Sequence, residues 1–154
     1  MRKASLILIL LICAHAVATQ ERTKVNDEAA ARVLLGRHKL SLQWISWDYF
    51  GTATITKAMA IYAIKGEQRG RGRISKDFVT VEGMIVSIDK DQFVMEGDIV
   101  TRVSYINGGK PCSRHGDFTF KITGKRKYWR LQQMDNPCDQ ATDYIDIYFR
   151  QNDT

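Results

Sequence analysis

The stretch from Cys112 to Phe149 constrains the fold more than any other part of the chain. It contains three short runs that alternate in side-chain character and are rich in aromatic or β-branched residues: Phe118–Ile122, Tyr128–Leu131 and Tyr144–Phe149. Such alternation is typical of strands. Residues that favour turns, among them glycine, asparagine and proline, separate the runs. The stretch therefore predicts a three-stranded antiparallel meander.

The N-terminus has the pattern of a signal peptide covering residues 1–18. Arg2 and Lys3 precede a short apolar run, and residues 16–18 have the A-x-A form of a cleavage site. We expect cleavage after Ala18, which leaves residues 19–154 as a single domain that is periplasmic or secreted. The alternative is a membrane anchor, but the apolar run is far shorter than the roughly 20 residues that cross a bilayer.

Cleavage of this peptide would remove Cys13 and leave Cys112 and Cys138. Two cysteines in an oxidising compartment form a disulfide by default. The alternative is a metal site, but neither a C-x-x-C motif nor a histidine pair accompanies these cysteines. The sequence therefore predicts a Cys112–Cys138 disulfide that clasps the meander.

The chain before the meander predicts one short helix followed by strands. Asn26 is a good N-cap residue, and the helix is expected to continue to Leu35 and to end at Gly36. Such a short helix must dock on something, for example the end of a barrel. From His38 onward, short alternating runs recur between turn signals, with a loop over residues 66–73. About eight strands after one helix predict an all-β fold, a small antiparallel barrel or sandwich.

One hairpin can be aligned from the sequence. A polar turn at residues 89–91 suggests that Ile88 lies opposite Gln92, and this register places Gly83 opposite Gly97. A slip of one residue would reverse the faces. In this register one face is apolar and is expected to point inward, with Val79, Val81, Ile85, Phe93, Met95, Ile99, Val103 and Tyr105. Two opposed inward glycines indicate a sharp bend or room for a ligand or a large side chain.

The run from Ile99 to Phe149, which includes INGGKPC, GDFTF, TGKRKYWRLQQMDNPC and TDYIDIYF, resembles a group of small exported bacterial proteins of no assigned function. The resemblance implies export and a β fold, and it supplies no catalytic residue. The layout of the whole chain is also similar to that of calycin-type ligand-binding barrels. That second likeness is architectural, and architecture alone does not imply function.

Residues with catalytic or metal-binding potential are few. Ser113, His115 and Asp117 share one face of an extended stretch. However, same-face neighbours on a strand lie about 6.5–7 Å apart, too far for a nucleophilic triad. His38 and His115 have no neighbours at metal-ligand spacing. We therefore expect no enzymatic activity, no metal and no cofactor.

Three carboxylates on the hairpin need an explanation. Glu82, Glu96 and Asp98 face away from the expected core, and Glu82 lies opposite Asp98 in the derived register. Because opposed like charges are unfavourable, we expect solvation or pairing with a basic group, for which Arg102 is one candidate and the arginine loop another. A calcium-like site is the alternative.

Two basic segments are candidate anion sites: Arg69, Arg71 and Arg73, and Lys125, Arg126 and Lys127. Flexible arginines suit phosphate or sulfate groups, although two solvated loops are the alternative. The net charge is +6, or +4 without Arg2 and Lys3. That excess is too small to indicate nucleic-acid binding and would allow weak contact with an anionic membrane surface.

The leading hypothesis is an exported, monomeric, non-enzymatic binding module that holds a small hydrophobic or amphipathic ligand inside a barrel. Its candidate ligand-binding residues combine apolar and polar groups, as pockets do, with core packing as the alternative for most of them: Gly83, Gly97, Trp129, Leu131 and Gln133. A second hypothesis is a protein-interaction module, an envelope-stress factor or secreted inhibitor, that acts through surface loops. A filled barrel with an exposed aromatic patch would favour this second hypothesis.

Overall fold

The computed structural model describes residues 22–150, so the expected signal peptide at residues 1–18 lies outside the described residues. Within that range the chain forms nine strands, one α-helix and two 3-10 helices. Their bounds are β1 Lys24–Val25, α1 Glu28–Leu34, β2 Gly36–Leu42, β3 Gly51–Ala58, β4 Ile61–Arg69, η1 Gly72–Ile74, β5 Phe78–Ile88, β6 Gln92–Arg102, η2 Asn107–Gly109, β7 Cys112–Lys121, β8 Tyr128–Leu131 and β9 Ile145–Tyr148.

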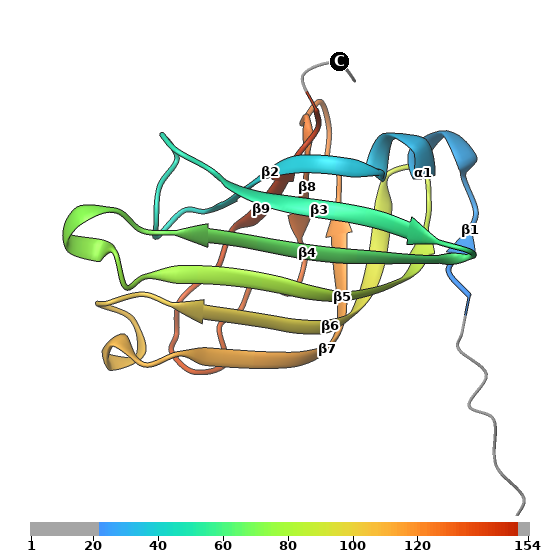
Figure 1. Cartoon of the computed structure of the whole chain (residues 1–154). Helices are drawn as coiled ribbons and strands as arrows, with labels where there is room; N and C mark the ends of the chain where they lie inside the picture. The colour runs from blue at the N-terminus through green and yellow to red at the C-terminus, as the bar shows by residue number, and fades with distance from the viewer. Residues whose placement is uncertain (1–21, 151–154) are drawn as a thin grey trace, which may run out of the picture.

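Strands β2 to β9 form a closed antiparallel barrel. Strands that follow each other in sequence pair from β2 through β9, and β9 pairs with β2 to close the barrel. The strands β3 to β7 run side by side in Figure 1, and β8 and β9 cross behind them. The two-residue strand β1 is added in parallel beside β5. The predicted all-β fold with one N-terminal helix is confirmed, and the architecture is a barrel rather than a sandwich.

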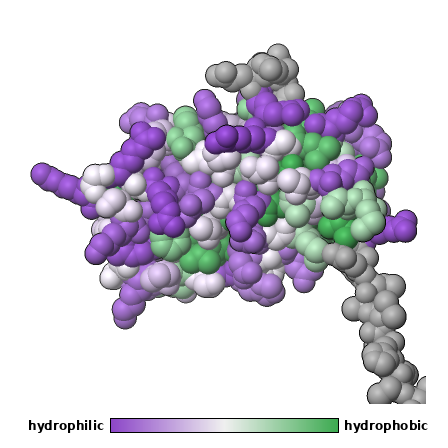
Figure 2. Space-filling model, in the orientation of Figure 1, coloured by the Kyte–Doolittle hydropathy of each residue, from purple (hydrophilic) through white to green (hydrophobic). Residues whose placement is uncertain are grey.

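The barrel interior is filled with side chains. Tyr62, Phe93, Phe120 and Met95 are all buried, because the inward positions of each strand alternate with outward polar ones. Phe93 and Phe120 stack with ring centroids 5.1 Å apart, and Trp129 meets Phe93 edge-on at 6.0 Å. Hydrophilic side chains cover most of the outer face in Figure 2, where the hydrophobic areas are small and separate.

Helix α1 lies at one end of the barrel, on the right in Figure 1. Its N-cap is Asp27, whose carboxylate accepts from the Ala30 amide at 2.8 Å. The predicted cap, Asn26, is wrong because its side chain donates instead to Asp89 at 2.7 Å. Leu34 is buried in the barrel core, as the short helix requires. Among the described residues no helix is long and apolar enough to cross a membrane.

The hairpin of β5 and β6 has the predicted register over most of its length. Gly83 lies opposite Gly97. Near the turn, a bulge between Ile85 and Ser87 inserts one residue, so Ile88 pairs with Phe93 and the expected pairing with Gln92 is wrong. The predicted inward face is also confirmed, except for one residue. Tyr105 lies beyond the end of β6 and is 65% exposed.

Three glycines form a row across the barrel wall, because Gly97 pairs with both Gly83 and Gly116. A Cβ atom added to Gly83 or Gly97 would run into a backbone carbonyl of the opposite strand. Gly116 has a φ of 145°, a conformation that other residues rarely adopt. Backbone therefore occupies the space at this row, which favours a bend over a ligand cavity; the role of Gly83 and Gly97 in ligand binding stays a prediction.

The C-terminal meander is confirmed as β7, β8 and β9, and the Cys112–Cys138 disulfide joins the start of β7 to the loop after β8. The boundaries of the arginine loop differ from the expected residues 66–73. Strand β4 continues to Arg69, pairing with Phe78, and the loop covers residues 70–77. The extension follows from alternation, because Gly66 and Gln68 point inward and are buried.

Candidate functional site at the loop end of the barrel

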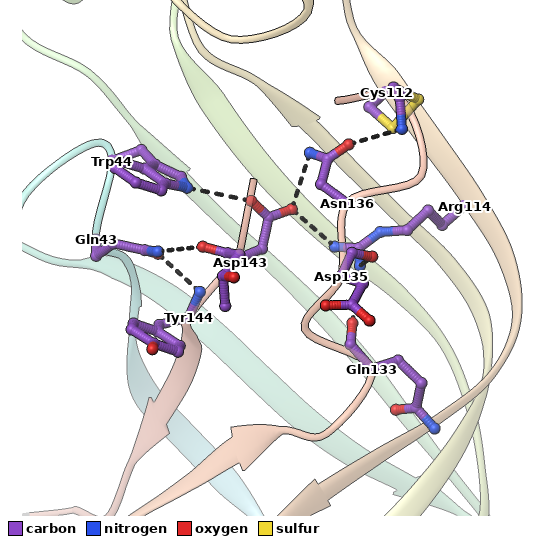
Figure 3. A network of polar contacts seen from close by, with 11 residues as sticks. Gln43, Trp44, Cys112, Arg114, Gln133, Asp135, Asn136, Asp143 and Tyr144 are labelled. Carbon is purple, nitrogen blue, oxygen red and sulfur yellow. Dashed lines mark hydrogen bonds and ion pairs between the residues drawn. A yellow bond between two sulfur atoms is a disulfide. The ribbon is translucent and has the colours of Figure 1, made fainter. Parts of the chain in front are cut away.

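Four long loops gather at the end of the barrel opposite α1: residues 43–50, 70–77, 103–111 and 132–144. We call this end the loop end. At its centre, Arg114 points inward from β7 and its guanidinium lies 3.2 Å from the Asp143 carboxylate. Both side chains are buried. Arg114 also donates to the backbone carbonyls of Gln133 and Asp135, so one arginine fixes the 132–144 loop at several points (Figure 3).

The Asp143 carboxylate connects three parts of the chain. One oxygen accepts from the Trp44 indole at 3.2 Å, and the other accepts from Asn136 at 3.1 Å as well as from Arg114. Asn136 in turn accepts from the amide of Cys138, next to the disulfide (Figure 3). A carboxylate with three donors is well satisfied for a buried group. The network therefore ties the disulfide, the barrel wall and the 43–50 loop together.

Burial disfavours the charged forms of both Asp143 and Arg114. It raises the pKa of Asp143, while Arg114, Trp44 and Asn136 act in the opposite direction. It also lowers the pKa of Arg114, against the attraction of Asp143. The Arg114 Nε has no partner among the described residues. Removing charges from water is costly, so neither group is left free: both are engaged in hydrogen bonds that hold the loops in position.

Side chains also connect the remaining loops. Gln43 donates to the Thr142 carbonyl and accepts from the Tyr144 amide, so it bridges two loops (Figure 3). The buried Gln68 of β4 holds both ends of the 43–50 loop, because it accepts from the Leu42 amide and donates to the Tyr49 carbonyl at 2.9 Å. These hydrogen bonds between side chains and backbone make the loop end a defined surface.

Asp77 connects the 70–77 loop to the end of β6. Its carboxylate accepts from Arg102 at 3.0 Å and from the Ser104 hydroxyl, and its second oxygen has no partner among the described residues. Arg102 was a candidate to balance the opposed carboxylates of β5 and β6, but the structure directs it to Asp77 instead. Glu82 forms an ion pair with Lys65 at 3.3 Å, and the Asp98 carboxylate is hydrogen-bonded to a ring nitrogen of His115 at 2.9 Å.

The loop end exposes aromatic side chains on this hydrogen-bonded framework. Trp47, Tyr105 and Tyr144 are 47%, 65% and 36% exposed. Tyr105 meets the Trp44 ring edge-on with centroids 6.3 Å apart, and its hydroxyl donates to the Trp44 carbonyl. Partial desolvation of its hydroxyl and the nearby Asp77 carboxylate both raise the pKa of Tyr105. A groove of about 530 Å³ runs beside the Tyr105 and Tyr144 rings, and its lining residues are Gln43, Trp44, Tyr105, Ile106, Asp139, Gln140, Ala141, Thr142 and Tyr144.

The predicted ligand-binding residues in and just after β8 do not line one pocket. Trp129 and Leu131 point into the filled core, whereas Gln133 is exposed and accepts from the Thr119 amide at 2.9 Å. The strand ends at Leu131, so Gln133 no longer follows the inward alternation. Trp129 and Leu131 are packed in the hydrophobic core, which was the alternative to ligand binding for these two residues.

The two basic segments lie at opposite ends of the barrel. Arg69 is paired with Glu67 at 2.6 Å, and Arg71 lies over the Tyr49 ring at 4.1 Å; both are near the loop end. Arg73 lies in η1 of the same loop, and the second segment, Lys125 to Lys127, lies in the turn between β7 and β8 at the helix end. The structure therefore does not combine them into one anion site.

The outward residues Ser113, His115 and Asp117 lie on β7 and are exposed. His115 contacts Asp98 on the neighbouring strand rather than either of these two residues. Within residues 22–150, no group of three or more histidine, cysteine or acidic side chains could hold a metal ion. Sequence reasoning missed Arg114 and Asp143, although the alternation of β7 between Cys112 and Phe118 does indicate that Arg114 points inward.

These features define a class of protein: a small, disulfide-clasped, eight-stranded β-barrel with a filled interior and aromatic side chains on fixed loops. The chain belongs to the PM1083 family, whose model matches residues 22–149. It is 53% identical over 116 residues to "Uncharacterized protein PM1083" of Pasteurella multocida (strain Pm70), over 75% of this chain and 73% of that relative. The family similarity therefore extends well beyond the C-terminal third. No solved structure gave a significant match.

Proposed function

We propose that this protein is an exported, non-enzymatic binding module that contacts a protein partner through its loop end. One observation carries the proposal: the barrel interior is filled, while the loop end exposes Trp47, Tyr105 and Tyr144, and the two tyrosines line a groove. A filled barrel with exposed aromatics favours surface recognition over an internal ligand. The Cys112–Cys138 disulfide supports export, because disulfides persist in oxidising compartments.

The loop end suits protein recognition for energetic reasons. Tryptophan and tyrosine are enriched among the residues that carry most of the binding energy at interfaces. Binding costs less when the contacting groups are already ordered, and here Gln43, Gln68 and Asp143 hold the loops before any partner arrives. The groove between the 103–111 and 132–144 loops would accept an apolar side chain of the partner.

The proposal can be tested by site-specific photo-crosslinking in the exported protein. A photoreactive phenylalanine at Tyr105 should give a defined crosslinked protein, whereas the same probe at Glu96, which is exposed on the barrel wall, should not. Excess wild-type protein should compete with the crosslink, and excess Trp47→Ser/Tyr105→Ser protein should not.

Equal crosslinking from both positions, or none from Tyr105, would contradict recognition by the loop end. Native mass spectrometry of the exported protein tests the internal-ligand hypothesis separately. A hydrophobic molecule that remains bound and that protects core residues such as Trp129 would support a ligand inside the barrel instead.

A further inference from the structure

A second pocket lies on the side of the barrel, away from the loop-end groove. We call it the lateral pocket; its volume is about 810 Å³ and it is lined by Arg37, His38, Lys39, Phe50, Gly51, Thr52, Lys127, Tyr148, Phe149 and Arg150. Four of these residues are cationic lysines or arginines, and none is acidic. The combination of several cations with aromatic rings is the chemistry that recognises anionic groups.

The barrel closure brings these cations together. Arg37 and Lys39 point outward from β2, because outward and inward positions alternate along that strand. Lys39 pairs directly with Tyr148 on β9. Lys127 reaches the same side because its carbonyl accepts from the Phe149 amide at 3.0 Å. Three segments far apart in the chain therefore contribute to one basic surface.

Three cations of the lateral pocket, Arg37, Lys39 and Lys127, are not neutralised within the part of the chain that the structure describes. Arg37, Lys39 and Lys127 form no ion pair with any described residue; Arg37 has a hydrogen bond to Thr52 at 3.3 Å. The nearest carboxylate on these strands is Asp146, which is buried and held by Arg130 through two hydrogen bonds of 2.7 Å.

Charge is distributed unevenly around the barrel. Strands β2, β8 and β9 contain a single acidic residue, Asp146, whereas the outward positions of β5, β6 and β7 contain several: Glu82, Glu96, Asp98 and Asp117. The side formed by β2, β8 and β9 therefore lacks exposed strand carboxylates, which favours the approach of an anion from that side. That side contains the lateral pocket.

Two aromatic rings border the pocket and can contact the rest of a ligand. Phe50 and Tyr148 meet edge-on with centroids 5.1 Å apart, and the Lys39 ammonium lies 5.1 Å from the Phe50 ring. Ser41 donates to the Tyr148 hydroxyl at 3.3 Å, which leaves the tyrosine proton available for an acceptor. A tyrosine hydroxyl keeps its proton at neutral pH, and burial raises the pKa of Tyr148 further from neutrality.

We infer that the lateral pocket binds a phosphate group, with Arg37, Lys39 and Lys127 around the anion and Phe50 and Tyr148 against the part that carries it. A guanidinium and two ammonium groups match the several oxygens of a phosphate. The phosphate could belong to a lipid head group or to a soluble molecule. The inference is independent of the proposed function, because the residues of this pocket are not part of the loop-end groove.

The experiment compares two triple variants of the mature protein. Arg37→Gln/Lys39→Gln/Lys127→Gln removes the lateral cations. The control, Lys76→Gln/Lys90→Gln/Lys110→Gln, removes the same charge from three exposed residues that lie outside the lateral pocket and outside both basic segments. Titration calorimetry with pyrophosphate and flotation with phosphatidylglycerol vesicles, compared with phosphatidylcholine vesicles, measure the two sources of phosphate. Melting temperatures confirm that both variants are folded.

We expect the lateral variant to bind at least about tenfold more weakly, because one charge-assisted hydrogen bond alone corresponds to roughly that factor. The control should bind within about twofold of wild type. Loss of pyrophosphate binding supports a soluble ligand, and loss of vesicle binding alone supports a lipid head group. Equal losses in both variants would show a diffuse charge effect, and no binding of either probe by wild type would overturn the inference.

Discussion

The two ends of the barrel are closed by different chemistry. At the helix end, Leu34 and Ala31 of α1 pack into the core, so the contact is apolar. At the loop end, the buried Arg114–Asp143 pair, hydrogen-bonded side chains and a disulfide hold four loops. The helix end has short turns between its strands, whereas the loops at the other end are long and carry exposed aromatic rings.

The difference suggests a division of roles. Apolar packing is non-directional and stabilises wherever surface is removed from water, so it suits an end that only needs to be closed. Buried polar networks hold groups in one geometry but stabilise little in return for their desolvation. A polar closure is therefore reasonable where loops must keep a defined shape, as the proposed binding role of the loop end requires.

Breaking the polar closure should have the largest effect. Asp143→Ala leaves the Arg114 charge buried without its carboxylate, and we expect a loss of about 3–5 kcal/mol in the free energy of unfolding. Urea denaturation measures it, with Asp117→Ala on the exposed outer face of β7 as the control. The double variant Arg114→Met/Asp143→Leu should recover most of the loss. A single variant as stable as wild type would mean that the network does not close this end.

Breaking the apolar closure at the helix end should cause the second-largest loss of stability. Leu34→Ala removes a fully buried side chain of α1, and large-to-small changes of this kind cost about 2–5 kcal/mol. Met59→Ala is a suitable control because Met59 is 91% exposed. We expect the near-ultraviolet circular dichroism of the loop-end aromatics to persist in folded Leu34→Ala. If that signal were lost, the two ends would not be independent.

The glycine row between the two ends provides a third test. Gly97→Val places a side chain against the Glu82 carbonyl of the opposite strand, and we expect a loss of about 1–3 kcal/mol by overpacking. Glu96→Val, one residue away and facing solvent, should be close to neutral. Although Gly70 lies in the 70–77 loop, it cannot serve as the control, because a Cβ atom there would meet the Ile74 carbonyl. An unchanged melting temperature for Gly97→Val would contradict the close approach of the strands.

The smallest effect is expected at the N-cap of α1. Asp27→Ala removes the acceptor of the Ala30 amide, and the loss of such a cap costs about 1 kcal/mol. Asn26→Ala serves as a comparison, because Asn26 is not the cap and instead contacts Asp89 at the barrel turn. Thermal unfolding should rank Asp27→Ala below wild type by a few degrees. A larger effect from Asn26 would reverse the assignment of the cap.

Much of the fold could be predicted because its signals are local. The alternation of β5 and β6 and the turn between them were sufficient to pair Gly83 with Gly97. The bulge next to Val86 could not be predicted, because one inserted residue barely changes the composition of the strand. The helix was predicted from its capping pattern. However, Asn26, Asp27 and Glu28 follow one another and all favour a helix N-terminus, so the sequence did not show which of them is the N-cap.

The candidate sites were much harder to predict than the fold. Arg114 and Asp143 come from separate parts of the chain, and nothing in either local pattern indicates that they meet. The aromatic groove was also missed, since Tyr105 continues the apolar alternation of β6 in sequence although the strand has already ended. Of the residues that form the lateral pocket, the sequence suggested only Lys127 for anion binding, because it belongs to a run of basic residues.

The sequence by itself determined the strands, the central register of one hairpin and the disulfide, because side-chain periodicity and turn chemistry act between near neighbours. Only the tertiary structure decided that the sheet closes through β2 and β9, where Leu40 meets Ile147. That closure is a contact between distant parts of the chain, whose formation depends on the packing of the whole core. It also decides which charges are buried together at the loop end and which are left exposed on the side of the barrel.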